Sequence, residues 1–195
     1  MTLKSEPCKK WRIWLLLFFS FSFIGWLWEV LFHFVTDGVF VNRGVLYGPW
    51  LPIYGSVGIM IVFVAGYLKE HPVGLFFAIM AFSAVAEYAT SWALEQLTGK
   101  RWWDYSSYAC NLKGRICLYG LVFFGVGGMV LVYWVVPWLE KSFRKIPSNT
   151  LTAVCILLSA AFAADALFAL KTPNQGEGIS NPAAVVIEQK QQAPR

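Results

Sequence analysis

Two glutamates lie within long hydrophobic stretches of this 195-residue chain, Glu29 in the first and Glu87 in the third. A carboxylate is costly in the hydrocarbon interior of a membrane, where it typically faces a partner, a transported solute or a proton path. A glycine-containing loop with an arginine follows each glutamate, with Arg43 after the first and Arg115 after the second. We therefore expect acidic and guanidinium groups from separate segments to meet in a shared polar centre.

Further polar residues recur at helical spacing around both glutamates. The first stripe contains Ser22, Gly25, Glu29 and His33, and the second contains Ser83, Glu87, Ser91 and Glu95. Residues three or four apart share one face of a helix, so both stripes are expected to face protein and to be partners across a bundle. For Glu29 and Glu87, a polar cavity or proton path and an internal scaffold of ion pairs are equally good interpretations. For Glu95, near a helix end, the scaffold is favoured.

Composition places the chain in a membrane, because 57% of its residues are hydrophobic and only 14% are charged. The expected fold is all-α and polytopic, with about five transmembrane helices in one bundle over residues 1–171. Their apolar runs are long enough for a bilayer core of roughly 30 Å, although the second is short. They cover residues 13–35, 53–68, 73–97, 116–139 and 151–170. Residues 172–195 are polar and are expected to form a flexible tail.

The first long loop, between Asn42 and Gly55, is rich in glycine and proline yet too apolar to lie free in water. It is expected to pack against the bundle or to enter it as a re-entrant segment. The residues that would shape it are Gly44, Gly48, Pro49, Pro52, Tyr54 and Gly55. A tight interhelical connection is favoured over a site for an anionic group.

The connection between the third and fourth hydrophobic runs is dense in aromatic and charged side chains. An interfacial aromatic belt explains Trp102, Trp103, Tyr105 and Tyr108 without a ligand. The belt does not explain Asp104, Asn111 and Arg115, which could bind a polar headgroup or close an ion pair with Glu87 or Glu95. The candidate substrate-binding site or polar core is therefore Glu29, Arg43, Glu87, Glu95, Trp103, Asp104, Asn111 and Arg115. Asp165, in the last apolar run, is a further polar contact that nothing else in the sequence supports.

The sequence lacks the motifs that are typical of several classes of protein. The four cysteines form no Cys-x-x-Cys pair or Cys/His cluster, so neither a metal nor another cofactor is expected. The net charge of +5 comes without a basic helix, which favours contact with anionic lipid over nucleic acid. No Walker lysine follows the glycines of the fourth run, Gly120 to Gly128, so these are expected to serve helix packing. Because no catalytic triad is present, an enzymatic role is the less favoured one.

Five ordered motifs resemble the bacterial family described as "putative ABC-transporter type IV", or CmpB-like, membrane proteins. They are Gly25-x-x-x-Glu29, the loop Arg43-Gly44 to Tyr54-Gly55, Glu87-Tyr88-x-Thr90-Ser91-x-x-x-Glu95, Trp102-Trp103-Asp104-Tyr105-Ser106 and Asn111-x-x-Gly114-Arg115-Ile116-Cys117-Leu118. The resemblance covers about Phe21 to Gly128, leaving out the fifth helix and the tail. It implies a transporter permease of the bacterial cytoplasmic membrane, with no agreed substrate or catalytic residue.

Three functions remain open at this level. A permease with about five helices would need a second copy or a partner permease, together with a separate ATPase. The alternatives are a membrane-embedded enzyme acting on a lipid or lipid-linked substrate and a non-catalytic partner or sensor.

Basic residues before and between the runs, such as Lys9, Lys10 and Lys141, favour a cytoplasmic N-terminus.

Overall fold

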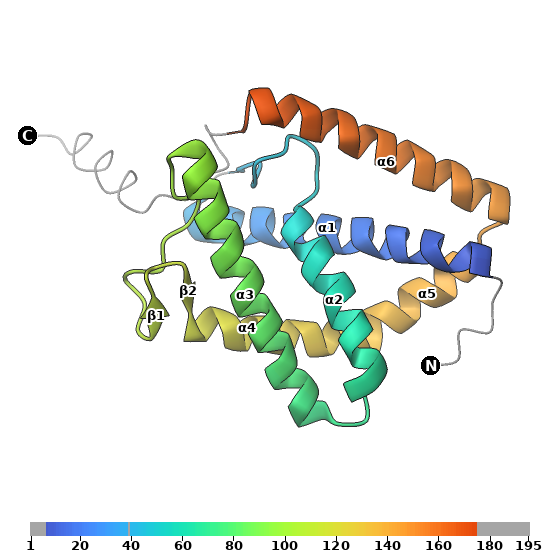
Figure 1. Cartoon of the computed structure of the whole chain (residues 1–195), viewed down its shortest axis with the longest axis horizontal. Coiled ribbons are helices and arrows are strands. Elements are labelled where there is room, and N and C mark those ends of the chain that lie inside the picture. Colours follow the sequence, from blue (N-terminus) through green and yellow to red (C-terminus); the bar gives the residue numbers. More distant parts are fainter. Residues whose placement is uncertain (1–6, 39, 175–195) are drawn as a thin grey trace, which may run out of the picture.

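The computed structural model describes residues 7–38 and 40–174 (Figure 1). Helices account for most of this part of the chain, which confirms the predicted all-α polytopic fold. The elements are α1 (Pro7–Asp37), α2 (Pro52–Leu68), α3 (Pro72–Thr98), β1 (Asn111–Leu112), β2 (Ile116–Cys117), α4 (Leu118–Val130), η1 (Leu131–Val135), α5 (Val136–Arg144) and α6 (Ser148–Lys171). The predicted polar tail lies outside the described residues from position 175 onward.

Within the described part, four helical stretches are long and apolar enough to cross a membrane. They are Lys10–Thr36, Pro72–Thr98, Leu118–Arg144 and Ser148–Lys171, and the shorter apolar helix Pro52–Leu68 joins them. Both α2 and α3 begin at a proline, whose missing N–H costs nothing in the first helical turn. Gly99 ends α3 in the left-handed conformation, with φ of 68°.

The helix α2 packs against both α1 and α3, with which it shares the centre of the molecule (Figure 1). A short turn joins α2 to α3, so these two helices run antiparallel. We predicted that the polar stripes of α1 and α3 are partners across a bundle. The helix that packs against both α1 and α3 is α2.

The stretch Leu118–Arg144, which contains the fourth hydrophobic run, is one continuous helical stretch made of α4, η1 and α5. Its middle section, η1, is a π-helical turn placed just before Pro137. Proline cannot donate an intrahelical hydrogen bond, and a wider turn accommodates such an interruption. Gly125 and Gly128 of α4 lie against α3, where an added Cβ would come within 2.5 Å of Phe76 and 2.7 Å of Ile79. At these two positions the glycines serve close helix packing.

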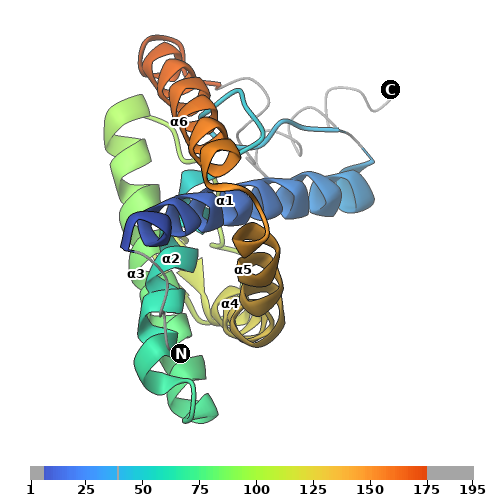
Figure 2. The same ribbon diagram turned by 90° about the vertical axis from the view of Figure 1, so that its right-hand side faces the viewer.

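The last helix, α6, runs along α1 on the side opposite α4 and α5 (Figure 2). Leu16 of α1 packs with Leu151 and Cys155 near the start of α6. The guanidinium of Arg12 donates hydrogen bonds to the Ser148 carbonyl and hydroxyl at 3.0 Å and to the Thr152 hydroxyl at 2.6 Å. These contacts anchor the N-terminal end of α6 to α1.

Candidate functional site

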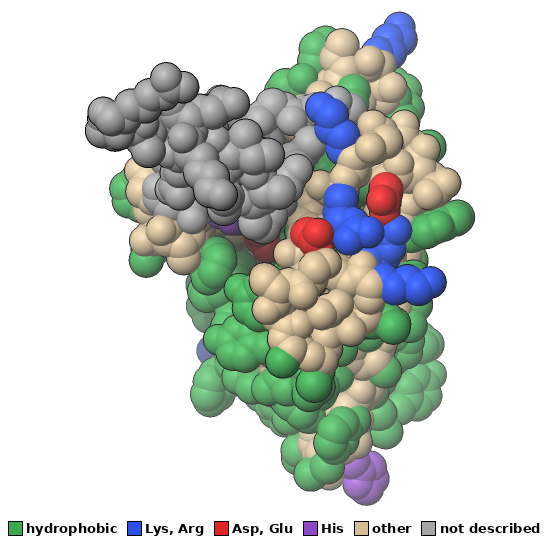
Figure 3. All heavy atoms as spheres, turned by 90° about the vertical axis from the view of Figure 1, so that its left-hand side faces the viewer, with side chains coloured by type: hydrophobic (Ala, Val, Ile, Leu, Met, Phe, Trp, Pro, Cys, Tyr) green, Lys and Arg blue, Asp and Glu red, His purple; other side chains and the backbone are tan. Residues whose placement is uncertain are grey.

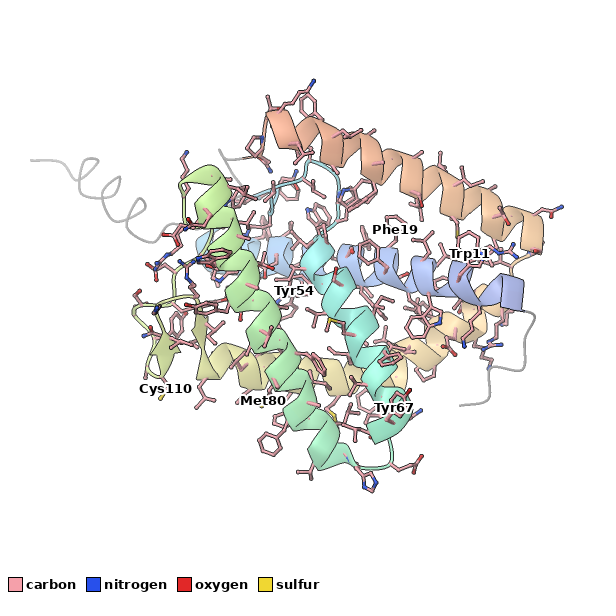
Figure 4. The ribbon with its side chains drawn as sticks, in the orientation of Figure 1. Trp11, Phe19, Tyr54, Tyr67, Met80 and Cys110 are labelled. Carbon is pink, nitrogen blue, oxygen red and sulfur yellow. The ribbon has the colours of Figure 1, made fainter. Side chains whose placement is uncertain are left out.

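Glu29 of α1 lies at the meeting point of α1, α2 and the first loop. One carboxylate oxygen, Oε1, accepts a 2.5 Å hydrogen bond from the phenol of Tyr54. The other, Oε2, lies 3.6 Å from Nε of Arg43 and 4.0 Å from Nε2 of His33. The Tyr54 ring lies directly on Gly25, where any Cβ would overlap it, and Figure 4 labels this tyrosine at the start of α2. A glycine on α1 therefore brings the phenol of α2 to the carboxylate.

Glu87 of α3 is the most deeply buried carboxylate of the candidate site, with 6% of its surface exposed. Its Oε1 accepts a 2.9 Å hydrogen bond from the phenol of Tyr105, which lies in the connection after α3. Its Oε2 is sealed from solvent and has no hydrogen-bond partner among the described residues. Ser83 and Ser91, one turn away on either side, are buried as well, so this stripe faces protein.

Arg115 of the β-hairpin pairs with Glu95, one of the two glutamates that the sequence offered. One guanidinium nitrogen forms an ion pair with Glu95, and another donates a 3.0 Å hydrogen bond to the hydroxyl of Ser91. The guanidinium also lies 5.7 Å from the ring centre of Tyr88. Arg115 therefore lies along the same stripe of α3 as Glu87 and is bound to its next two members.

Asp104 belongs to a more exposed charged group at the end of α3. Its Oδ1 lies 3.5 Å from Arg101, which is also 3.8 Å from Glu95. Burial alone would raise the pKa of the Asp104 carboxyl, but hydrogen bonds from Ser106 and the charge of Arg101 outweigh it and lower that pKa. Figure 3 shows basic and acidic side chains interleaved on this end of the molecule. Asp104 therefore joins the polar centre only indirectly, through Arg101 and Glu95.

Trp103 and Asn111 have structural contacts in this connection. The indole of Trp103 donates a 3.0 Å hydrogen bond to the backbone carbonyl of Arg115. The side chain of Asn111 donates to the Tyr108 carbonyl at 2.8 Å and accepts from the amide of Gly114 at 2.9 Å, which closes the hairpin. Both residues therefore hold the segment that carries Arg115.

The aromatic belt is wrong as an explanation of Trp102 and Tyr105. Trp102 is only 2% exposed, and Tyr105 reaches inward to Glu87. The connection folds back over the end of α3 and β2, so these aromatic groups enter the protein rather than the headgroup region. Tyr108, by contrast, is exposed. The tyrosine partners of Glu29 and Glu87 are the main contacts of these carboxylates that sequence reasoning missed.

The two carboxylate sites act on each other electrostatically. Burial, followed by the charges of Glu87 and then Glu29, raises the pKa of the Tyr105 phenol. Glu29 thus lies within electrostatic reach of the phenol that bonds Glu87. The structure brings together two Glu–Tyr pairs, one beside Arg43 and one beside the stripe that holds Arg115.

The first loop packs against α1 and α6. Its Leu51 amide donates a 3.0 Å hydrogen bond to the Ser22 carbonyl of α1. The carboxylate of Asp165 accepts from the amides of Tyr47 and Gly48 at 3.0 and 2.8 Å and from the indole of Trp50 at 2.7 Å. Asp165 therefore fixes the loop from the opposite side. Among the predicted shaping residues, Gly44 has a positive φ of 98° and Pro52 starts α2.

Fold and site together define a polytopic α-helical membrane protein with acidic, basic and phenolic groups inside its bundle. A family model described as "Putative ABC-transporter type IV" matches residues 16–170, and the chain belongs to this family. The match includes α6, which the motifs in the sequence had left outside the resemblance. No curated protein and no solved structure matches the chain significantly.

Proposed function

We propose that this protein is a permease subunit of a membrane transporter and that the Glu/Arg/Tyr centre lies on the path of its substrate. The observation that supports this most directly is Glu87, a buried carboxylate in a membrane-spanning helix with one oxygen lacking a partner among the described residues. A group of this kind is costly in a bilayer, and such groups commonly mark ion and substrate pathways. A purely structural scaffold would gain by satisfying both oxygens.

An energy source for this transport would have to come from another protein. The glycines of α4 that could suggest a phosphate loop include two that are packed against side chains of α3. We therefore propose a separate ATPase as partner and a second copy or a further permease to complete the path.

Membrane location follows from the apolar helices, and we place the protein in the bacterial cytoplasmic membrane with its N-terminus inside.

The test uses the full-length protein in lipid vesicles, with its co-purifying proteins retained. The vesicles are loaded with a small-molecule extract of the host bacterium, and the solutes that leave are compared with and without ATP. The wild type should release specific solutes that empty vesicles retain, and Glu87→Gln should abolish this release. Glu70→Gln is the matched control, because Glu70 is exposed in the turn between α2 and α3. Release that does not differ from empty vesicles would overturn the proposal.

A lipid extract from the same strains separates the alternative functions. A change in lipid composition in Glu87→Gln, with normal protein level and no solute release by the wild type, would favour the membrane-embedded enzyme. Altered assembly alone, with both solutes and lipids unchanged, would favour the non-catalytic partner or sensor.

The orientation has its own test. A reporter enzyme that is active only outside the cytoplasm, fused after residue 195, should be active if the N-terminus is inside and the chain crosses the membrane about five times. An inactive reporter on a stable fusion would overturn this orientation or the number of spans.

A further inference from the structure

Glu87 differs from every other acidic group in the polar centre by its lack of a basic partner. Glu29 lies beside Arg43, Glu95 is paired with Arg115 and Arg101, and Asp104 lies beside Arg101. Within residues 7–38 and 40–174, the phenol of Tyr105 is the hydrogen-bond partner of Glu87, and no ion pair forms. The charge of an ionised Glu87 would therefore remain uncompensated.

The surroundings of Glu87 make ionisation expensive. The residue is 6% exposed, and its Oε2 is sealed from water. An ionised carboxylate buried without a counter-charge costs several kcal/mol, whereas the protonated acid is neutral and can keep its hydrogen bond. The nearby charge of Glu29 adds to the cost, because two like charges disfavour each other at short range.

A proton is the ligand that this site can take. Ca²⁺ needs about six to eight oxygen ligands and Mg²⁺ about six. In the described part of the chain no group of three or more His, Cys, Asp or Glu side chains comes together. An organic cation needs open volume beside the carboxylate, but Oε2 is buried and closed to solvent. A proton needs neither extra ligands nor space.

We propose that Glu87 is the proton-binding residue of this transporter, with the proton on Oε2 and the Tyr105 phenol donating to Oε1. This inference rests on the proposed function, to which it adds the ion that the polar centre binds. On binding, a proton from water forms the O–H bond of the neutral acid. On release, the proton returns to water and Glu87 becomes a carboxylate.

When the proton leaves, the negative charge of Glu87 needs a cation close by to stabilise it. Arg115 is close enough along α3 to supply this positive charge. Its guanidinium holds Ser91 and Glu95, the next members of the stripe that contains Glu87. Successive members of this stripe are about one helical turn apart, or about 5.4 Å along the axis. A shift of the Arg115 side chain by about one turn would therefore carry its charge from Glu95 to the ionised Glu87.

The other titratable groups around this site are phenols, a thiol and one further acid. Tyr105 and Glu29 act on Glu87 directly. Tyr54 from α2 and Cys117 from β2 act on the partners Glu29 and Tyr105. Phenols and thiols are neutral over most of the physiological range, so Glu29 is the group whose charge opposes that of Glu87. Arg115 is the cation bound to the stripe of α3 that contains Glu87.

Infrared difference spectroscopy on the full-length protein in lipid nanodiscs tests the proposal. A protonated carboxylic acid has a carbonyl stretching band that the carboxylate lacks. The wild type should show such a band, which disappears reversibly as the pH is raised. Glu87→Gln should lose this band, whereas Glu95→Gln should keep it. Tyr105→Phe should move the band to higher frequency, because the carbonyl oxygen loses its hydrogen-bond donor.

Arg115→Gln tests the second part of the proposal. Without this guanidinium the stripe of α3 loses the cation that we propose for the ionised Glu87, so the band should persist to a higher pH than in the wild type. A band that disappears at the same pH in both proteins would overturn the role of Arg115.

The variants also decide between failure of this inference and failure of the transport proposal. If Glu87→Gln does not fold, the frequency shift in Tyr105→Phe still identifies the band. A band that neither variant alters would overturn the proton site, even if solute release is normal. A band that behaves as described, in a protein that releases no solute, would leave the proton site intact and overturn transport.

Discussion

Asp165 of α6 and Trp50 of the first loop are joined by a 2.7 Å hydrogen bond from the indole nitrogen to the carboxylate. The same carboxylate accepts the backbone amides of Tyr47 and Gly48. Most of α6 lies at the surface of the molecule, and Arg12 anchors its other end. Asp165 is therefore a polar anchor that attaches α6 to the rest of the bundle, and it also sets the path of the loop that carries Arg43.

Replacing Asp165 should detach the loop from α6. In Asp165→Asn the side-chain NH₂ group would face N–H groups that are themselves donors. The negative charge that strengthens the three hydrogen bonds would also be lost. A hydrogen bond to a charged group contributes about 1.5 to 3 kcal/mol, so we expect a clear drop in the thermal unfolding temperature of the purified protein. Trp50→Phe removes the indole donor and part of the ring but leaves both backbone amides bound to Asp165, and it should cost less. The double variant should lose less than the sum of both, and strictly additive losses would contradict the direct bond.

The glycines of α4 offer a comparison between neighbouring positions. A Cβ at Gly128 would lie 2.7 Å from Ile79 of α3, whereas a Cβ at Gly127 would meet nothing within 4 Å. Gly128→Ala should therefore destabilise the protein by about 1 to 3 kcal/mol through overpacking. Gly127→Ala should be neutral or stabilising, because alanine is the better helix former. The free energy of unfolding in mild denaturant measures both, and equal effects would show that α3 and α4 can separate without cost.

The sequence predicted which charged residues lie inside the protein better than it predicted which residues they contact. Helical spacing and apolar length are local properties, and they located the helices and the inward stripes of Glu29 and Glu87. The Glu29–Arg43 pair joins segments only a short loop apart. The Tyr105–Glu87 bond depends on the connection after α3 folding inward, and an aromatic residue near a helix end looks the same when it faces lipid headgroups.

Asp165 illustrates a contact that the sequence could not reveal. Its partners are two backbone amides and an indole more than a hundred residues earlier in the chain. Backbone groups carry no sequence signal, so an isolated aspartate among alanines gives no indication of what it binds. The position of α2 between α1 and α3 was equally hidden, because it follows from packing around Gly25 and not from the polar stripes.

The connection after α3 should become less stable in acid. The folded-state pKa of Asp104 is lowered, so its ion pair and hydrogen bonds contribute stability above about pH 4, the ordinary range of an aspartate. This contribution is lost as the pH falls through the lowered value. The wild type should therefore be more stable than Asp104→Asn at neutral pH, by less than about 1 kcal/mol because the pair is partly exposed. Thermal unfolding across pH measures the difference, which should shrink in acid; a difference that grows there would reverse the assignment.

Tyr54→Phe should weaken the polar centre while leaving its packing intact. The ring would still cover Gly25, but Glu29 would lose a 2.5 Å hydrogen bond in a largely buried place. Loss of a hydrogen bond to a charged acceptor predicts a cost of about 1.5 to 3 kcal/mol in unfolding free energy. Tyr67→Phe, on the exposed side of the same helix, is the matched control and should be neutral. Gly25→Ala should cost more than Tyr54→Phe, because the added Cβ displaces the whole ring and so removes both the packing and the hydrogen bond. A Tyr54→Phe protein as stable as Tyr67→Phe would mean that the phenol adds nothing to the hold on Glu29, and that Arg43 and His33 suffice to keep this carboxylate in place.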